Sequence, residues 1–266
     1  MDGEGGPLPS SEAEVQRLLY FLSRKVKKAV REFRLLEDGD RVLVAVSGGK
    51  DSLSLLLLLQ ALRRELPVRY DLHPVHVRLA EDAPCHPGDP SALAQWVAER
   101  TGLELLVVPM EPARGEPGRP GQSPCFHCAW RRRKAIFLAA DRLGCNKVAL
   151  AHHADDVAQT TLMNLANQGR LDTMWPRVAF FGGRFTVIRP LFFVPEKDLA
   201  RLARVALFPP APPPCAAAEA TQRAFMARIL EELETRQPHA KANLWRAVQR
   251  YGRQPTPEEE EREREL

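Results

Sequence analysis

Residues 41–54 read Arg-Val-Leu-Val-Ala-Val-Ser-Gly-Gly-Lys-Asp-Ser-Leu-Ser, and this stretch decides the fold. The apolar run 42–46 predicts a short strand that is buried on both faces. Gly48 and Gly49 break the run, and the leucines of 53–59 predict a helix directly after the loop. A strand, a glycine turn and a helix N-terminus in this order form an anion site, because free backbone N–H groups and the helix dipole face the ligand. The stretch therefore predicts a phosphate-binding loop.

The polar residues of this loop suit a phosphate ligand. Lys50 adds positive charge, Ser47 and Ser52 offer hydroxyl groups, and Asp51 can hold a metal or a ligand hydroxyl. A Gly-Gly turn alone is about as often an ordinary βα turn. The full string 47–52 matches neither the Walker A motif nor the dinucleotide motif. It resembles the Ser-Gly-Gly-x-Asp-Ser loop of the N-type ATP pyrophosphatases, which adenylate a substrate and release pyrophosphate.

Composition favours a soluble, basic α/β protein. The chain has 266 residues, of which 44% are hydrophobic, which is enough for one large domain with extensions. No apolar run approaches the roughly 20 residues that cross a bilayer, and the sequence does not open on a secretory signal, so we expect a cytoplasmic protein without a membrane segment. The net charge of +4 rises to +8 without the glutamate-rich segment 258–266. A positive charge of this size on the rest of the chain favours binding to a polyanion such as RNA, although a well-solvated surface can carry the same charge.

Strand and helix patterns alternate along the chain and predict a doubly wound parallel sheet of the Rossmann-like α/β class. Strands are predicted at 42–46, 70–79, 103–109 and 147–151, a hairpin at 177–189, and helices at 12–36, 53–59, 91–100, 126–143, 154–167, 195–205 and 219–236. Ligands of such folds bind at the carboxyl ends of the strands. The loop after Val46 and a second polar string after Ala151 both fall at such ends.

The chain divides into five predicted segments. The central segment is a catalytic, ATP-binding domain. The segments are a disordered N-terminus (1–11), a basic helix (12–36), the catalytic domain (37–207), a helical extension (208–254) and a disordered acidic tail (255–266). The basic face of the helix over 12–36 is interpreted equally well as an RNA-binding face or as a solvated one.

Five cysteines, an odd number, favour a metal or reactive thiols over a disulfide scaffold. Cys125 and Cys128 form a C-x-x-C at a predicted helix N-terminus, where thiol pKa values fall and metal ligation or redox chemistry is favoured. The residues alone leave zinc, a disulfide and an Fe–S cluster open. Cys215 follows a proline run and can complete a three-cysteine site. Cys145 is expected to be structural, and no ligand role is expected for Cys85.

Three further motifs resemble those of the Fe–S-dependent tRNA thiolases of the 2-thiocytidine synthetase family. The motifs are Cys125-x-x-Cys128-Ala-Trp-Arg-Arg-Arg, Ala151-His-His-Ala-Asp155-Asp156 and Ile188-Arg-Pro-Leu191. The resemblance implies a fold of the adenine nucleotide alpha-hydrolase type, ATP as co-substrate, Mg2+, and a 4Fe–4S cluster on Cys125, Cys128 and Cys215 with one iron open to carry sulfur. Many relatives have another cysteine three residues after the third ligand, where this chain has Ala218.

The resemblance also suggests roles for charged residues. Asp51, Asp155 and Asp156 are predicted catalytic residues, the last two as metal ligands or proton handlers. A carboxylate pair that merely stabilises a helix N-terminus is the alternative for Asp155 and Asp156. Arg132 is predicted to stabilise phosphate charge or the cluster. Its neighbours Arg131 and Arg133 are expected to touch RNA backbone.

The predicted activity is tRNA thiolation. The enzyme would adenylate the C2 carbonyl of a cytidine in the anticodon loop, at position 32 by resemblance, and replace the oxygen with sulfur, releasing AMP and pyrophosphate. The basic helix, the cluster 131–134 and the C-terminal helices are expected to bind tRNA, with the target base turned out of its stack. A cysteine desulfurase or another sulfide source is the expected partner, and a homodimer is possible by resemblance. Alternatives are a lysidine or 2-thiouridine synthetase and a non-catalytic, zinc-stabilised RNA-binding or sulfur-carrier protein.

Overall fold

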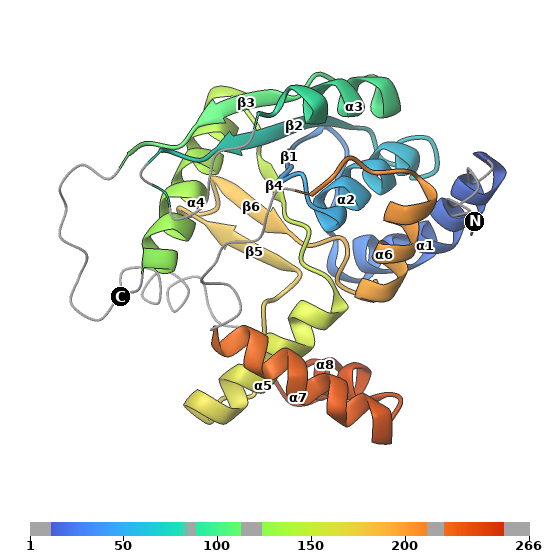
Figure 1. Cartoon of the computed structure of the whole chain (residues 1–266), viewed down its shortest axis with the longest axis vertical. Helices are drawn as coiled ribbons and strands as arrows, with labels where there is room; N and C mark the ends of the chain where they lie inside the picture. The colour runs from blue at the N-terminus through green and yellow to red at the C-terminus, as the bar shows by residue number, and fades with distance from the viewer. Residues whose placement is uncertain (1–11, 82, 84–88, 113–123, 212–220, 253–266) are drawn as a thin grey trace, which may run out of the picture.

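The computed structural model describes residues 12–81, 83, 89–112, 124–211 and 221–252, and within these a single sheet of six strands forms the centre (Figure 1). The strand order is β3-β2-β1-β4-β6-β5. All neighbouring strands are parallel except β5 and β6, which form an antiparallel hairpin at one edge. The strands span Asp40–Ala45 (β1), Tyr70–Arg78 (β2), Leu106–Pro109 (β3), Lys147–Ala149 (β4), Arg177–Phe180 (β5) and Phe185–Ile188 (β6).

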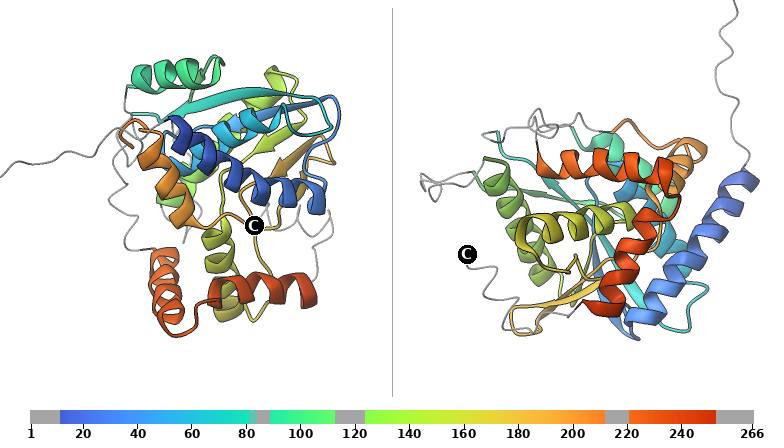
Figure 2. Two further views of the ribbon diagram at one scale, coloured as in Figure 1. Left: turned by 90° about the vertical axis from the view of Figure 1, so that its right-hand side faces the viewer. Right: turned by 90° about the horizontal axis from the view of Figure 1, so that it is seen from below.

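Helices cover both faces of the sheet, and three more form a separate unit at one side (Figures 1 and 2). The first face carries α1 (Glu12–Phe33), α2 (Lys50–Leu62), α3 (Ser91–Thr101) and α6 (Glu196–Val205). The second face carries α4 (Pro124–Arg142). The separate unit consists of α5 (Ala154–Gln168), α7 (Gln222–Arg236) and α8 (Ala240–Tyr251), which pack against one another.

Burial on both faces explains the unbroken apolar run of β1. Val42 and Val44 pack into the core beneath α1 and α2, whereas Leu43 packs into the core beneath α4. The leucines of α2 are enclosed as well, because this helix lies between the sheet and the helices α1, α3 and α6. The prediction of a central, doubly covered strand followed by a buried helix is confirmed.

Most predicted elements are confirmed, with differences at their ends. The helix after the loop begins at Lys50 instead of residue 53, and the hairpin lies where it was expected. The extension holds two helices, α7 and α8, where only one was delimited. The predicted disordered ends and Cys85 lie outside the described residues. Among the described residues, no helix combines the length and the apolar character that crossing a bilayer requires.

A buried ion pair joins the amino ends of β1 and β4. Lys147 lies 3.3 Å from Asp40, and both side chains are less than 5% exposed. Replacing Lys147 by alanine is expected to lower the free energy of unfolding by about 3 kcal/mol, because the Asp40 charge stays buried without its cation. Urea denaturation measures the change. Arg236→Ala, which removes a surface pair with Glu232, should cost no more than about 0.5 kcal/mol. Equal losses in both variants would contradict the structural role of Lys147.

Candidate active site

The two polar motifs meet because their strands are neighbours in the sheet. β1 ends before the loop 47–49 and leads into α2, and β4 ends before the string 150–153 and leads into α5. The strand order reverses between β1 and β4, since β2 and β3 lie beyond one and β6 and β5 beyond the other. In open α/β sheets this switch point forms the ligand-binding crevice at the carboxyl ends of the strands. The expected position of both motifs is confirmed.

Hydrogen bonds within the loop hold it in a closed turn. Ser52 Oγ donates to the Gly49 carbonyl at 2.9 Å and accepts from the Ser47 backbone N–H at 3.1 Å. Gly48 has a φ of +85°, which an L side chain rarely adopts. Gly49 is the N-cap of α2, and no side chain caps this helix. The first N–H groups of α2 therefore face outward, as a phosphate site requires.

The two loop glycines should respond differently to substitution. Gly48→Ala is expected to lower the free energy of unfolding by about 1–2 kcal/mol, because alanine resists the left-handed backbone. Gly49 has a φ of −77°, and an added Cβ would meet only Ser47 Oγ at 3.5 Å. Gly49→Ala should therefore stay within about 0.5 kcal/mol of the parent. Urea denaturation without nucleotide tests both variants, and similar losses would disprove the assigned loop conformation.

Lys50 and Asp51 lie at the start of α2 and contact each other and α6. Lys50 Nζ donates to Glu196 Oε1 at 2.8 Å and lies 3.3 Å from Asp51 Oδ2. Burial lowers the pKa of Lys50, but the hydrogen bond that it donates to Glu196 and the charge of Asp51 outweigh burial, so the pKa is raised. Burial raises the pKa of Asp51 in spite of His153 and Lys50 nearby. Asp51 Oδ1 is buried and accepts no hydrogen bond among the described residues, so this oxygen remains available to a ligand.

Asp155 and Asp156 open the first turn of α5, beside the buried ring of His153. Asp156 Oδ2 accepts a hydrogen bond from the His153 backbone N–H at 3.0 Å and lies 3.4 Å from His153 Nε2. The same ring nitrogen lies 3.9 Å from Asp51 Oδ2. His153 therefore sits between the loop carboxylate and the α5 carboxylates. The structure brings Asp51, Asp155 and Asp156 to one site, as the sequence predicted.

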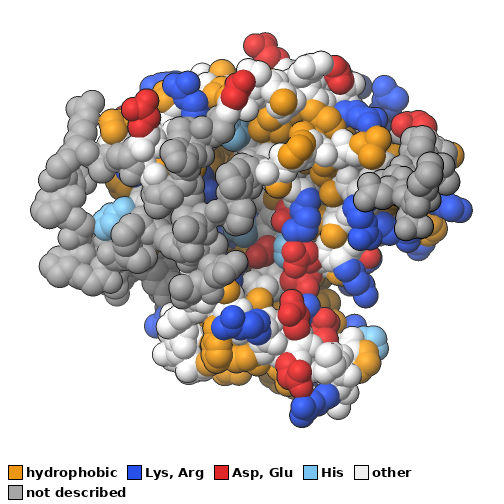
Figure 3. Space-filling model, in the orientation of Figure 1, with side chains coloured by type: hydrophobic (Ala, Val, Ile, Leu, Met, Phe, Trp, Pro, Cys, Tyr) orange, Lys and Arg blue, Asp and Glu red, His pale blue; other side chains and the backbone are white. Residues whose placement is uncertain are grey.

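Several residues of this site had no signal in the sequence. Glu196 contacts both motifs, because its side chain accepts from Lys50 and its backbone N–H donates to Asp155 Oδ2 at 2.7 Å. Two cations of α7 and α8, which together form the C-terminal unit, also reach the site: Lys241 Nζ lies 2.8 Å from Asp155 Oδ1, and Arg223 lies 3.1 Å from Asp156 Oδ1. Acidic and basic side chains accordingly gather where the main body meets the C-terminal unit (Figure 3).

The motif at 188–191 contacts His152 through Arg189. Arg189 Nε donates to His152 Nδ1 at 3.2 Å, and its guanidinium also donates to the Trp175 carbonyl. Burial and the nearby cations Arg189 and Arg223 lower the pKa of His152 to about 3. His152 is therefore neutral near pH 7 and acts as an acceptor.

The cysteine motif opens α4, on the opposite face of the sheet from α2. Cys128 is a half-buried free thiol in the first turns of this helix, and Arg132 is exposed one turn later. Arg131 donates to the Glu111 carbonyl at 3.1 Å, and Arg133 is exposed. The side chain of Cys125 and all of Cys215 lie outside the described residues. The predicted cluster ligands therefore stay a prediction.

Cys145 matches its predicted structural role. Its side chain is buried beneath α4, and burial raises the pKa of its thiol to about 11. Within the described part of the chain, no three His, Cys, Asp or Glu side chains are arranged to hold a metal ion.

A mostly parallel sheet with a Ser-Gly-Gly-Lys-Asp-Ser loop at its switch point defines a PP-loop nucleotide-binding domain. The family model described as a PP-loop domain matches residues 19–209. The tRNA-cytidine(32) 2-sulfurtransferase of Geobacter sulfurreducens is 40% identical over 85% of this chain and 88% of its own length. That of Paracidovorax citrulli is 35% identical over 90% of this chain and 76% of its own.

A solved structure shares the fold. The U34-tRNA thiolase NcsA from Methanococcus maripaludis, solved with its 4Fe-4S cluster, superimposes with a TM-score of 0.69 at 24% identity, covering 94% of this chain and 86% of that one. The chain belongs to the PP-loop family and, within it, to the family of the tRNA-cytidine(32) 2-sulfurtransferases. The resemblance noted in the sequence is thereby confirmed.

Proposed function

We propose that this chain is an ATP-dependent sulfurtransferase that converts a cytidine of the tRNA anticodon loop, at position 32, to 2-thiocytidine. One observation supports the ATP-dependent half directly: the loop 47–52 and the α5 carboxylates face each other at the switch point of the sheet. The family of the relatives supports the tRNA base and the sulfur chemistry. Neither a lysidine nor a 2-thiouridine activity has a comparable observation in its favour.

The proposed reaction has two balanced steps. The C2 carbonyl oxygen of the cytidine attacks the α-phosphorus of ATP, and pyrophosphate leaves. Hydrosulfide then attacks C2, and AMP leaves with the former carbonyl oxygen, so no net oxidation or reduction occurs. The open N-terminus of α2 and Lys50 would hold the phosphates, and Asp51 would orient the reacting groups or a Mg2+ ion. Asp155 and Asp156 would hold Glu196, Lys241 and Arg223 in place beside the loop.

An Fe–S cluster on Cys125, Cys128 and Cys215 belongs to the same proposal. The free, half-buried thiol of Cys128 near the start of α4 is chemically suited to ligate iron. The cluster would supply a position that holds hydrosulfide for the second step. Mg2+ would neutralise phosphate charge in the first step, and the unpaired, buried Asp51 Oδ1 is a donor that suits it. Arg132, exposed on α4, would stabilise negative charge during transfer.

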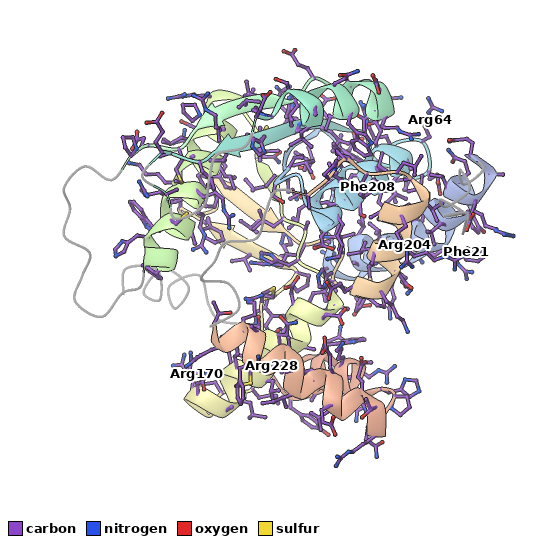
Figure 4. The ribbon with its side chains drawn as sticks, in the orientation of Figure 1. Phe21, Arg64, Arg170, Arg204, Phe208 and Arg228 are labelled. Atoms are coloured by element: carbon purple, nitrogen blue, oxygen red, sulfur yellow. The ribbon has the colours of Figure 1, made fainter. Side chains whose placement is uncertain are left out.

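Exposed cations and aromatic rings supply surfaces for tRNA. Arg170, just after α5, and Arg228 on α7 lie at the surface (Figure 4), and Phe225, one turn before Arg228 on α7, is exposed as well. On α4, Trp130 is half-exposed, and Lys134 Nζ lies 5.8 Å from its ring centroid. Cations and stacking rings of this kind bind single-stranded RNA. We propose a cytoplasmic enzyme that receives sulfide from a cysteine desulfurase or another source and that forms a homodimer.

Nucleoside mass spectrometry of tRNA tests the proposed function. The anaerobically purified chain would be incubated with ATP, Mg2+, sulfide and unmodified tRNA carrying C32, and iron, sulfide and zinc would be quantified in the same sample. About four irons per chain, broad absorbance near about 400 nm and ATP-dependent 2-thiocytidine are expected. A matched tRNA with U32 should give no thiolated product. Zinc without iron after anaerobic reconstitution, with no thiolated base, would exclude the proposed chemistry.

A further inference from the structure

The two carboxylates of the α5 motif are each held by a cation from the C-terminal unit. Lys241 of α8 lies 2.8 Å from Asp155 Oδ1, and Arg223 of α7 lies 3.1 Å from Asp156 Oδ1. Both cations come from parts of the chain that follow the PP-loop domain match at 19–209. The carboxylates lie at the switch point of the sheet, so the C-terminal unit reaches the centre of the site.

Asp155 has a protein partner on each oxygen. Oδ1 faces Lys241, and Oδ2 accepts from the Glu196 backbone N–H at 2.7 Å. Burial alone would raise the pKa of Asp155, but Lys241 and the Glu196 N–H outweigh burial and lower it. The Asp155 side chain is 10% exposed and that of Lys241 is 21% exposed. A pair this well shielded from water interacts strongly and fixes the geometry of the carboxylate.

Asp156 also has a protein partner on each oxygen, although its cation Arg223 is 43% exposed and this pair is less shielded from water. Oδ2 accepts from the His153 backbone N–H, and Oδ1 faces Arg223. The motif carboxylates therefore use their oxygens on protein groups, whereas Asp51 Oδ1 remains buried and unpaired among the described residues. The geometry separates two kinds of carboxylate: Asp51 keeps one oxygen available to a ligand, whereas the oxygens of Asp155 and Asp156 face protein groups.

Packing and capping order the two helices that carry these cations. Thr221 caps α7 two residues before Arg223, by accepting a hydrogen bond from the Ala224 N–H at 3.2 Å. Met226, Leu230 and Val248 are buried where α7 and α8 pack on α5. Trp245 of α8 also packs against Phe193 of the main body, with ring centroids 5.0 Å apart. Glu234 of α7 lies 2.9 Å from Lys241, so this cation has a second partner within its own unit.

A chain of contacts links the C-terminal unit to the phosphate loop. It runs from Glu234 to Lys241, to Asp155, to the Glu196 backbone and through the Glu196 side chain to Lys50. We propose that Arg223 and Lys241 are positioning residues for the adenylation step, so that the C-terminal unit completes the active site in addition to any contact with RNA. This inference rests on the proposed function, because its readout is turnover.

Pyrophosphate release by the full-length, cluster-loaded enzyme tests the inference. Lys241→Met and Arg223→Met keep the length of the side chain and remove its charge. Each is expected to lower kcat for tRNA-dependent pyrophosphate release by about 10- to 100-fold, the usual effect of losing an outer-shell partner. The KM for ATP should change by less than about threefold, since Lys50 and the loop are intact. Lys241→Arg and Arg223→Lys should restore most of the turnover.

Two further measurements separate positioning from general damage. Arg63→Ala removes a surface cation 3.4 Å from Asp71, far from the site in the fold, and should leave kcat unchanged. In an Asp155→Asn background, Lys241→Met should have little additional effect, because partners in one contact are not additive. Thermal unfolding of each variant reports folding separately.

The outcomes are distinct. A wild-type enzyme that releases no pyrophosphate with tRNA would contradict the proposed function. An active wild type whose Lys241→Met and Arg223→Met variants keep their kcat would overturn the inference. Full additivity of Lys241→Met with Asp155→Asn, or equal losses of kcat and ATP affinity without rescue by the conservative variants, would also overturn it, because the cations would then act only through stability.

Discussion

Replacing Cys128 by serine is expected to abolish 2-thiocytidine formation and to remove most of the iron, while ATP binding is retained. Cys128 lies on α4, which covers the opposite face of the sheet from α2 and the phosphate loop. Serine has almost the same shape but is a poor iron ligand, so the change removes ligation with little change in packing. Iron quantitation, equilibrium binding of an ATP analogue and nucleoside mass spectrometry measure the three effects.

Cys145 provides the matched control for this experiment. It follows the same helix, but its thiol is buried in the core beneath α4 and its pKa is raised to about 11. Cys145→Ala should keep iron and thiolation and cost only about 1 kcal/mol of stability, through a small cavity. A Cys128→Ser enzyme that retained iron and thiolated tRNA would rule out Cys128 as a cluster ligand.

Replacing Asp51 by asparagine is expected to reduce tRNA-dependent pyrophosphate release by about 100-fold or more, because the site loses a negative charge placed at the phosphate loop. Asp51 Oδ1 is buried without a hydrogen-bond partner among the described residues, and Oδ2 lies 3.3 Å from Lys50. Asparagine keeps the volume and one oxygen but holds neither a metal nor a cation as a carboxylate does. Thiolation should fall in parallel with pyrophosphate release.

The stability of the Asp51→Asn variant should not fall along with its activity. Burial raises the pKa of Asp51, so the folded state disfavours its ionised form, and Asp51→Asn is expected to unfold at the same temperature as the parent or higher. Asp71→Asn is the control. It changes an exposed carboxylate at the amino end of β2 and should leave turnover intact. Near-normal pyrophosphate release by Asp51→Asn would refute a reactive role for this residue.

Local patterns made most of the fold predictable. The run 42–46, the glycines that follow it and the leucines of α2 lie within about 20 residues of one another, so their structure follows from neighbouring residues and from burial on both faces. The approach of the string after Ala151 to the loop also followed, because parallel strands bring their carboxyl ends to one edge.

The residues that contact the motif carboxylates from other helices could not be predicted from local patterns. Glu196 contacts Asp155 across 41 residues, Arg223 contacts Asp156 across 67, and Lys241 contacts Asp155 across 86. Each is a single charged residue within an ordinary amphipathic or polar helix, and its partner depends on how separate helices pack. Helix α8 was not delimited from the sequence, and only Val248 of this helix is fully buried.

The burial of α2 between the sheet and its neighbouring helices makes the phosphate loop a rigid part of this enzyme. Leu53, Leu55 and Leu58 of α2 are fully buried. The phosphate loop therefore connects a strand and a helix, and neither of them can move without opening the core. Charged side chains of α5, α7 and α8 pair with one another on the opposite side of the site. The phosphate loop is therefore preformed, so nucleotide binding should lose little conformational entropy in ordering it.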